Sequence, residues 1–472
     1  MNFVFVDIAL LILFVIFVSV FLYRNKKNLK REGLLFLYRT KWGMQLIDKT
    51  GKKYKKTLKF LSYVSITVGY LLMVGILWLF GKIIYLYVAY PAVVKAIKIP
   101  PITPLFPYVD KLVPNLGLPT LHFVYFIIIL AVIAIPHEFF HGIFMRRYNI
   151  KIKSTGFGFF PFFLPVFLAA FVEQDEKSMS KSGIFKQLSV LSAGTFANIL
   201  TAILFGAIMI GFFVLSFAPA GVQFNTYSYS IANISSIDSF NGNFIDNPTY
   251  ENLIELSKEE GYNQIGIDGV IYLSDKNLLI KQEKNSETGL LILYDEAPAI
   301  NADLKGAIVE FNGAEIKGWE ELGSEINKYF PGDEVEIKTT EGDYEVVLAE
   351  HPLDEGKAWL GIGYQEQSRS GVIGKFIDWI SSFKKQNIFY EEKFTGAEFI
   401  YNLFWWLVLI SFSVALVNML PMGIFDGGRF FYLTILAITK KPKVAENWFK
   451  GITRFLLFLV ILLMVFWFIG FV

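Results

Sequence analysis

The sequence His137-Glu138-Phe139-Phe140-His141 places two histidines and a glutamate at the end of a long apolar run. Residues four apart on a helix share a face, so His137 and His141 can bind one metal ion through their ring nitrogens. Glu138 then lies beside that ion, where it can take a proton from bound water. The alternative is a chance match. The unbroken apolar residues before it argue against chance, because ionisable groups inside a membrane span are costly and usually functional.

The composition indicates a membrane protein with a separate water-soluble part. Of the 472 residues, 54% are hydrophobic and 17% aromatic, and the mean hydropathy is +0.46. These values exceed those of a soluble globular chain and predict several membrane spans. Residues 221–390 hold 13 of the 44 basic and 29 of the 42 acidic residues, so an acidic block interrupts a basic membrane protein. We expect the lipid bilayer, and no nucleic acid, as a partner.

The inventory of metal-binding side chains is short. The chain has no cysteine, which excludes a thiol nucleophile, disulfides and thiolate ligands. It has four histidines, two of them in the motif, so we expect a carboxylate as the third ligand of a single zinc ion. His122, at the far end of the same apolar run, is interpreted as an interfacial residue.

Six apolar runs are long enough to span a bilayer. The first has no basic residue before it and no small-residue cleavage site, so it is interpreted as an anchor rather than a signal peptide. Basic clusters follow the first, third and fifth runs, which places those ends in the cytoplasm and both termini outside. The predicted spans are Phe3–Tyr23, Phe60–Phe80, Phe123–Met145, Leu188–Phe217, Phe399–Asn418 and Phe455–Val472.

Two stretches beside the motif are not simple spans. Residues 156–172 are apolar but contain two glycines and two prolines, which favour a re-entrant hairpin at membrane depth over a helix. An interfacial loop is the alternative. The fourth span carries small residues and an amide, Asn198, which either serves the site or only bridges two helices.

The acidic region 221–390 reads as a soluble α+β domain. Strand-like runs at 289–294, 307–311 and 333–339 alternate with turn signals, and a short helical piece covers 319–329. The parity of the spans places this region outside the cytoplasm. Residues 222–288 show no clear pattern.

With these motifs in place, the chain resembles the site-2 protease family, the M50-type intramembrane zinc metalloproteases. The resemblance rests on His137–His141 in a membrane helix and on Asn418-x-x-Pro421-x-x-x-x-Asp426-Gly427 after a later one. It implies that His137, His141 and Asp426 bind zinc and that Glu138 activates water. From the sequence we place Asp426 on irregular backbone near the inner face.

The resemblance also implies substrate-binding residues. Asn418 matches an asparagine near the family's active site, and Gly156 and Gly158 fall where the family has a β-hairpin whose edge pairs with an unwound substrate. Asn198 ends a segment similar to a family Ala-Gly-Pro-x-x-Asn pattern, with Thr195 in place of the proline. We therefore expect residues 156–160 to offer the free edge.

A second resemblance concerns the soluble region, where residues 289–364 are similar to a protease-associated PDZ domain. It rests on Ala297–Gly313, Pro331-Gly-Asp333 and Leu360–Gly363, and implies a groove for a peptide or a substrate tail. The expected organisation is an N-terminal segment with two spans (1–120), two halves of a protease core (121–220 and 391–472), and the soluble insertion between them.

The sequence thus predicts a polytopic α-helical membrane protein that hydrolyses peptide bonds in or beside the transmembrane helices of other membrane proteins. The main alternative is a zinc-binding transport or regulatory protein without catalysis, which would have no need of Glu138 beside its ligands. An inactive scaffold that presents the PDZ-like domain and a soluble-type metalloprotease with membrane anchors are the others.

Overall fold

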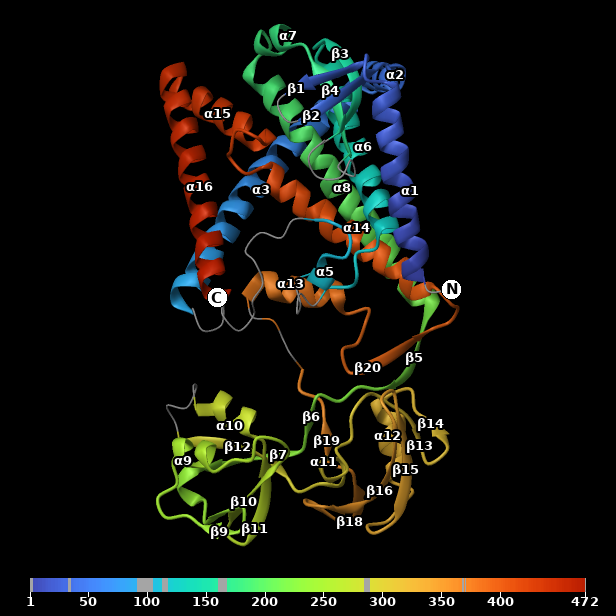
Figure 1. Ribbon diagram of the computed structural model, residues 1–472, viewed down its shortest axis with the longest axis vertical. Coiled ribbons are helices and arrows are strands. Elements are labelled where there is room, and N and C mark those ends of the chain that lie inside the picture. The colour runs from blue at the N-terminus through green and yellow to red at the C-terminus, as the bar shows by residue number, and fades with distance from the viewer. Residues whose placement is uncertain are drawn as a thin grey trace. The chain divides into compact units, whose positions relative to one another are not determined.

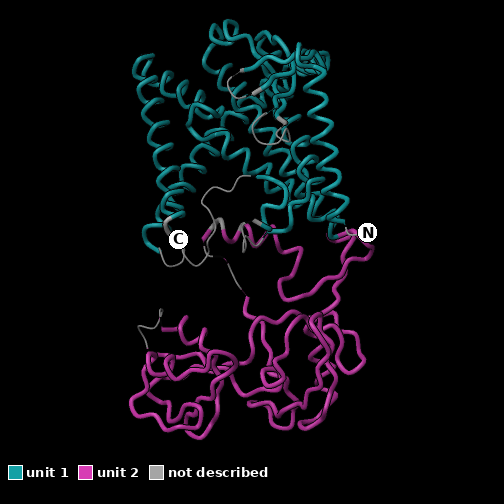
Figure 2. The backbone as a smooth tube through the Cα atoms, viewed as in Figure 1, with its two compact units in different colours: residues 1–212, 398–472 teal, residues 213–397 magenta. Residues whose placement is uncertain are grey.

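The structure is a computed structural model in which the chain forms two compact units. It describes residues 3–32, 35–90, 105–112, 118–159, 168–283, 289–366, 369 and 371–471. Unit 1 comprises residues 1–212 and 398–472, and unit 2 comprises residues 213–397 (Figure 2). Figure 1 labels the elements of both.

Unit 1 is built on long apolar helices. In the part of the chain that the structure describes, six helices are long and apolar enough to cross a membrane, and each overlaps one predicted span. They are α1 (Phe3–Arg24), α3 (Lys55–Ala89), α6 (Phe123–Arg147), α8 (Ile184–Ser216), α14 (Ala397–Asn418) and α16 (Pro442–Phe471). Shorter helices are α2 (Met44–Lys53), α5 (Val109–Leu112), α7 (Glu176–Ser180) and α15 (Asp426–Thr439).

A four-stranded antiparallel sheet in the order β1-β2-β3-β4 lies at the end of unit 1 that also carries α2 and α7 (Figure 1). Its strands are β1 (Leu29–Glu32), β2 (Leu35–Thr40), β3 (Ile152–Phe159) and β4 (Leu168–Gln174). Strands β3 and β4 form the predicted hairpin, whose tip at 160–167 lies outside the described residues. Strands β1 and β2 were not expected, because the basic residues around them read only as a cytoplasmic loop.

The prediction that residues 156–160 offer a free strand edge is wrong. Gly156 pairs with Arg39 of β2 on one side and with Phe171 of β4 on the other, and Gly158 is likewise paired on both sides. The N-terminal segment supplies the strand that covers this edge. Gly156 is required for a different reason: a Cβ there would overlap the Tyr38 carbonyl oxygen and the Phe171 ring. Within the described residues, the edge strands of this sheet are β1 and β4, and β4 is the edge strand of the predicted hairpin.

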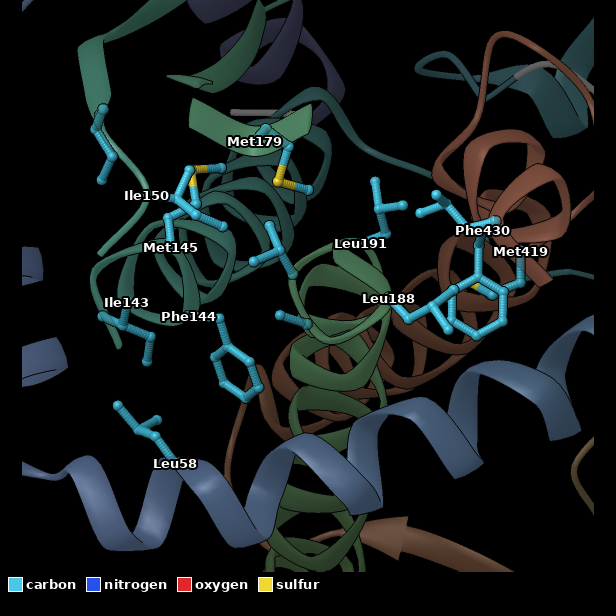
Figure 3. Close-up of a cluster of buried hydrophobic side chains, with 14 of the residues drawn as sticks. Leu58, Ile143, Phe144, Met145, Ile150, Met179, Leu188, Leu191, Met419 and Phe430 are labelled. Carbon is cyan, nitrogen blue, oxygen red and sulfur yellow. The ribbon is translucent and has the colours of Figure 1, made fainter. Parts of the chain in front are cut away.

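Several helices of unit 1 meet around a large apolar cluster (Figure 3). Most of its buried side chains come from α3, α6, α8, α15 and the end of α14; they include Leu58, Phe144, Leu188, Met419 and Phe430. Helix α2 packs closely on α6, and a Cβ at Gly142 would overlap the side chain of Ile47. Residues before 120 and after 398 thus share one core with the motif helix.

The described residues of unit 2 form two larger sheets and two short strand pairs. One sheet has the order β7-β12-β11-β10-β8-β9, and the other β16-β15-β13-β5-β20, with β14 paired to β13. The strands of the first are β7 (Tyr229–Asn233), β8 (Ser239–Phe240), β9 (Asn243–Phe244), β10 (Asn263–Ile267), β11 (Val270–Ser274) and β12 (Leu290–Asp295). Those of the second are β5 (Phe217–Val222), β13 (Ile308–Phe311), β14 (Ala314–Glu315), β15 (Glu334–Thr339), β16 (Asp343–Val347) and β20 (Ile388–Glu392).

The remaining elements of unit 2 are short. Strands β6 (Thr226–Tyr227) and β19 (Ile362–Gly363) pair with each other, as do β17 (Ala349–His351) and β18 (Asp354–Trp359). The helices are η2 (Ile234–Ser236), α9 (Tyr250–Glu255), α10 (Lys276–Glu283), α11 (Pro298–Asn301), α12 (Trp319–Ile326) and α13 (Gly371–Ser381).

The three predicted strands and the predicted helix of this region are present as β12, β13, β15 and α12. Residues 222–288, which showed no clear pattern, form most of the first sheet and, together with Leu291 and Leu293 of β12, its apolar core. Strand β12 falls inside the predicted PDZ-like boundaries of 289–364, yet it pairs with β7 and β11 of that first sheet.

Candidate metal centre

Helix α6 presents both histidines of the motif on one buried face. His137 and His141 are 8% and 7% exposed, and their Nε2 atoms lie 3.1 Å apart. The helix closes with Arg146 and Arg147 in its last turn, where positive charge is favourable. The four-residue spacing therefore places two imidazole nitrogens side by side, as the sequence predicted.

Asp426 reaches the same point from the other half of unit 1. It is the first residue of α15, not a residue of irregular backbone as expected. The two following glycines allow this approach, because a Cβ at Gly427 would overlap the backbone of Met419 and one at Gly428 the carbonyl of Met422. The break after α14 is thus compact, and it returns the chain to α6.

The ligand atoms of His137, His141 and Asp426 lie at distances from one another that fit a tetrahedral metal site. Asp426 Oδ2 lies 3.5 Å from His137 Nε2 and 3.2 Å from His141 Nε2. A tetrahedral zinc ion with bonds of about 2.0–2.1 Å holds its ligand atoms about 3.3 Å apart. Two imidazole nitrogens and one carboxylate oxygen at this spacing suit zinc and leave a fourth position open.

The outer nitrogen of each imidazole has a buried partner. His141 Nδ1 donates to the carbonyl oxygen of Val190 over 2.7 Å, which leaves Nε2 free for a metal. His137 Nδ1 lies 3.1 Å from the amide Nδ2 of Asn198, whose Oδ1 is buried without a partner. Rotating that amide by 180° gives Oδ1 a donor, the Nδ1–H of His137, and frees His137 Nε2 in the same way.

Helix α8 approaches the centre closely at Gly194. A Cβ at this position would overlap the rings of both His137 and His141. Gly194 was not among the predicted site residues, although it lies between two other small residues, Ala193 and Thr195, in the segment that ends at Asn198. A glycine at this point of a small-residue run was the available signal.

Glu138 lies beside His137, His141 and Asp426 and lines a cavity. One of its carboxylate oxygens and the imidazole nitrogens of His137 and His141 lie within 4.8 Å of one another. The backbone N–H of Val172, in β4, donates to Glu138 Oε2 over 2.8 Å. The cavity has a volume of about 490 Å³, and the charged or polar residues Arg39, Lys153, Glu173, Gln174 and Glu176 line part of it. A smaller apolar pocket, which Glu138 also lines, is formed by Trp42, Ile135, Phe139 and Phe157, among others.

The other predicted site residues lie outside this group. Asn418 is the last residue of α14, and among the described residues no hydrogen bond joins it to the histidines or to Asp426. Gly158 lies inside the sheet, and Gly156 lines the smaller pocket. Arg39, Val172 and Val190 belong to the surroundings of the centre, but nothing in their local sequence indicated this.

Comparison with known proteins gives one family. The profile of Peptidase family M50 matches residues 125–463. Zinc metalloprotease RasP of Shouchella clausii is 28% identical over 213 residues, which cover 37% of this chain and 49% of that protein. A Vibrio cholerae protein named "Putative zinc metalloprotease" is 22% identical over 435 residues, covering 70% of this chain and 94% of that protein.

A third relative is uncharacterized protein MJ0971 of Methanocaldococcus jannaschii, 28% identical over 196 residues, with 41% of this chain and 48% of that protein covered. The chain thus spans about half the length of RasP and of this archaeal relative. The family and the long apolar helices together make it a multi-pass membrane protein. Since the family profile covers most of the chain and includes both the histidine pair and Asp426, the chain belongs to peptidase family M50.

Proposed function

We propose that the protein is an intramembrane zinc metalloendopeptidase that cleaves membrane-protein substrates in or beside their transmembrane helices. The observation that carries this is the meeting of His137, His141 and Asp426 at 3.1–3.5 Å, with Glu138 beside them. All four side chains lie on α6 or at the start of α15, and α6 is apolar enough to span a membrane. The names of the zinc metalloprotease relatives support the same chemistry.

Each residue has a separate role in this proposal. His137, His141 and Asp426 hold one zinc ion per chain, and the Val190 carbonyl and Asn198 orient the two imidazoles. Zinc, when bound, supplies a Lewis acid that makes water a nucleophile at neutral pH. Glu138 accepts the proton of that water and passes it to the leaving amine, which completes hydrolysis.

The substrate reaches this centre in an extended form. A transmembrane helix keeps its carbonyl groups in its own hydrogen bonds, so it must unwind before cleavage. The unpaired edge of β4 faces Glu138 through Val172, and it can accept an extended backbone by strand addition. The apolar pocket beside Glu138 suits a hydrophobic side chain of the substrate strand. The larger cavity, which is lined by charged groups, suits water and a polar side chain of the substrate.

Unit 2 supplies recognition outside the membrane in this scheme. Its second sheet, with α12 packed on it, supports a PDZ-like domain that binds a peptide or the outer tail of a substrate. The basic residues at the end of α6 support a centre near the cytoplasmic side, and the parity of the predicted spans supports unit 2 on the extracytoplasmic side of the membrane.

The test compares the wild-type protein with Glu138→Gln in detergent, on a panel of single-span substrates, with bound zinc measured in parallel. We expect cleavage by the wild type alone, equal zinc in both at one ion per chain, and loss of wild-type cleavage on chelation. Equal zinc binding with no cleavage by either protein would favour a non-catalytic zinc protein. A wild type that binds no zinc would refute the site.

A further inference from the structure

Glu138 is held by the strand that we propose to bind the substrate. Its Oε2 atom accepts the backbone N–H of Val172 at 2.8 Å. Val172 lies in β4, whose only partner among the described strands is β3. Glu138, the general base of the proposed reaction, therefore accepts a hydrogen bond from an N–H group of β4, the edge strand that we propose to bind the substrate.

The register of the sheet shows which donors of β4 point away from β3. Val172 is opposite Thr155, and Ala170 is opposite Phe157. Backbone groups of a strand alternate between its two edges, so a Val172 N–H that reaches Glu138 places the Ala170 N–H on the same outer edge. An added antiparallel strand would need these N–H groups as donors to its own carbonyls.

We propose that substrate docking and release of the base are one event: the substrate backbone takes the Val172 N–H from Glu138 and thereby frees the carboxylate to accept the water proton. This inference rests on the proposed function, because it assigns a step to the same site. Without a strand on β4, Glu138 is tied to the sheet. With one, its hydrogen bond is replaced by a peptide carbonyl, and Val172 stays satisfied.

The arrangement restricts hydrolysis to unwound substrates. A peptide that remains helical cannot offer a free carbonyl to Val172, so it leaves Glu138 in place. An extended peptide must displace a carboxylate from the edge, which lowers its apparent affinity but activates the site that will cut it. The competition between Glu138 and the substrate for one N–H group is the measurable consequence.

Two substitutions at position 138 separate competition from catalysis. Glu138→Gln and Glu138→Ala both remove the charge and the base, but only glutamine keeps an oxygen that can accept the Val172 N–H. The probe is a fluorescein-labelled ten-residue peptide of valine, threonine and lysine. Each variant, as the whole 472-residue chain, is titrated into the peptide twice, once loaded with zinc and once after treatment with EDTA. We expect Glu138→Ala to bind it about fivefold more tightly than Glu138→Gln, as loss of one competing hydrogen bond predicts.

Proline substitutions in β4 supply the matched control. Proline is tolerated on an edge strand where its missing N–H faces outward. Val172→Pro removes the contested donor, so Glu138→Ala and Glu138→Gln should bind the peptide equally in that background. Ala170→Pro removes the neighbouring outward donor, and the fivefold difference should persist there. A difference that survives Val172→Pro would mean that the space left by alanine, not the hydrogen bond, improves binding.

Equal affinity of Glu138→Ala and Glu138→Gln in the native background would overturn the inference while leaving zinc-dependent cleavage by the wild type intact. Failure of every variant to bind the peptide would overturn it as well, because β4 would then accept no strand. Loss of the zinc site, by contrast, would show in the metal content of the proteins and would count against the proposed function.

Discussion

Asp7 of α1 caps the first turn of the metal-centre helix at Phe123. Its Oδ2 atom accepts the backbone N–H of Phe123 at 2.6 Å, and its Oδ1 atom accepts that of Val124 at 2.9 Å. The Tyr108 hydroxyl donates to the same carboxylate at 2.5 Å, and Asp7 is 0% exposed. The first N–H groups of a helix have no partner within it, and negative charge is favourable there. The first apolar helix is therefore bonded to the start of α6 and is more than an anchor.

Replacing Asp7 by alanine should destabilise unit 1. The N–H groups of Phe123 and Val124 would be buried without acceptors, at about 1–3 kcal/mol for such a loss. We expect a drop of about 5 °C in the melting temperature of the purified protein in detergent. Asp7→Asn retains one oxygen acceptor and should lose less. Equal melting of Asp7→Ala and the wild type would show that this cap contributes nothing to stability.

Gly194→Ala should abolish zinc binding without unfolding the protein. The added methyl group would occupy the space of the His137 and His141 rings and force them apart. Gly211→Ala is the control on the same helix, because nothing lies within 4 Å of a Cβ at that position. The measurement is zinc per chain by elemental analysis, with melting temperature recorded for both variants. Normal zinc content in Gly194→Ala would contradict the packing described.

Asn198→Ala should weaken zinc binding by about 10–100-fold, as loss of a group that orients a ligand histidine usually does. Asn198 lies 3.1 Å from His137 Nδ1. Asn418→Ala is the comparison, since Asn418 has no hydrogen bond to the ligand side chains among the described residues. Competition with a chelator gives both affinities, and equal losses in the two variants would argue that Asn198 acts only through general packing.

Glu173 makes the stability of the sheet depend on pH. Burial by itself raises the pKa of Glu173, but the hydrogen bond from Ser154 and the charge of Arg39 outweigh burial and hold the pKa below its usual value. A folded pKa below the unfolded value of about 4.3 means that the carboxylate stabilises the fold above that pH. This stabilisation is lost as the pH falls through the folded pKa.

The corresponding measurement is the melting temperature of the wild type and of Glu173→Gln between pH 3 and pH 8. We expect the wild type to melt about 2 °C higher from pH 6 to pH 8, and the difference to shrink below about pH 4.5. A difference that is constant over the whole range would show that the Arg39–Glu173 ion pair, at 2.8 Å, makes no net contribution.

Much of the architecture follows from local pattern. The predicted spans overlap α1, α3, α6, α8, α14 and α16, because length and apolar composition alone satisfy the requirements of a bilayer. The spacing of His137 and His141 follows from helix geometry, and it needs no tertiary information. Strands β13 and β15 were readable from alternation and turns, whereas residues 222–288 lacked that contrast and were not.

The sequence alone did not predict which segments pair when they lie far apart in the chain. Gly156 was placed correctly on a strand, but its edge was assigned wrongly, since nothing local indicates that β2 of the N-terminal segment would cover β3. In the sequence, Asp7 is a single acidic residue in an apolar run, and only the fold brings the N–H group of Phe123 to it. Likewise, Gly194 is one of several small residues in the sequence, and only the fold shows that it packs against the imidazole rings of His137 and His141.

The sequence by itself thus determined the apolar helices and the histidine pair of the motif, since both depend on residues a few positions apart. Only the tertiary structure decided which strand edge stays open, what holds Glu138 and what caps α6. Those contacts join residues that are 34 positions apart for Glu138 and Val172, and 116 for Asp7 and Phe123. Periodicity carries no information over such separations, because it records which face a residue takes and not which partner that face meets.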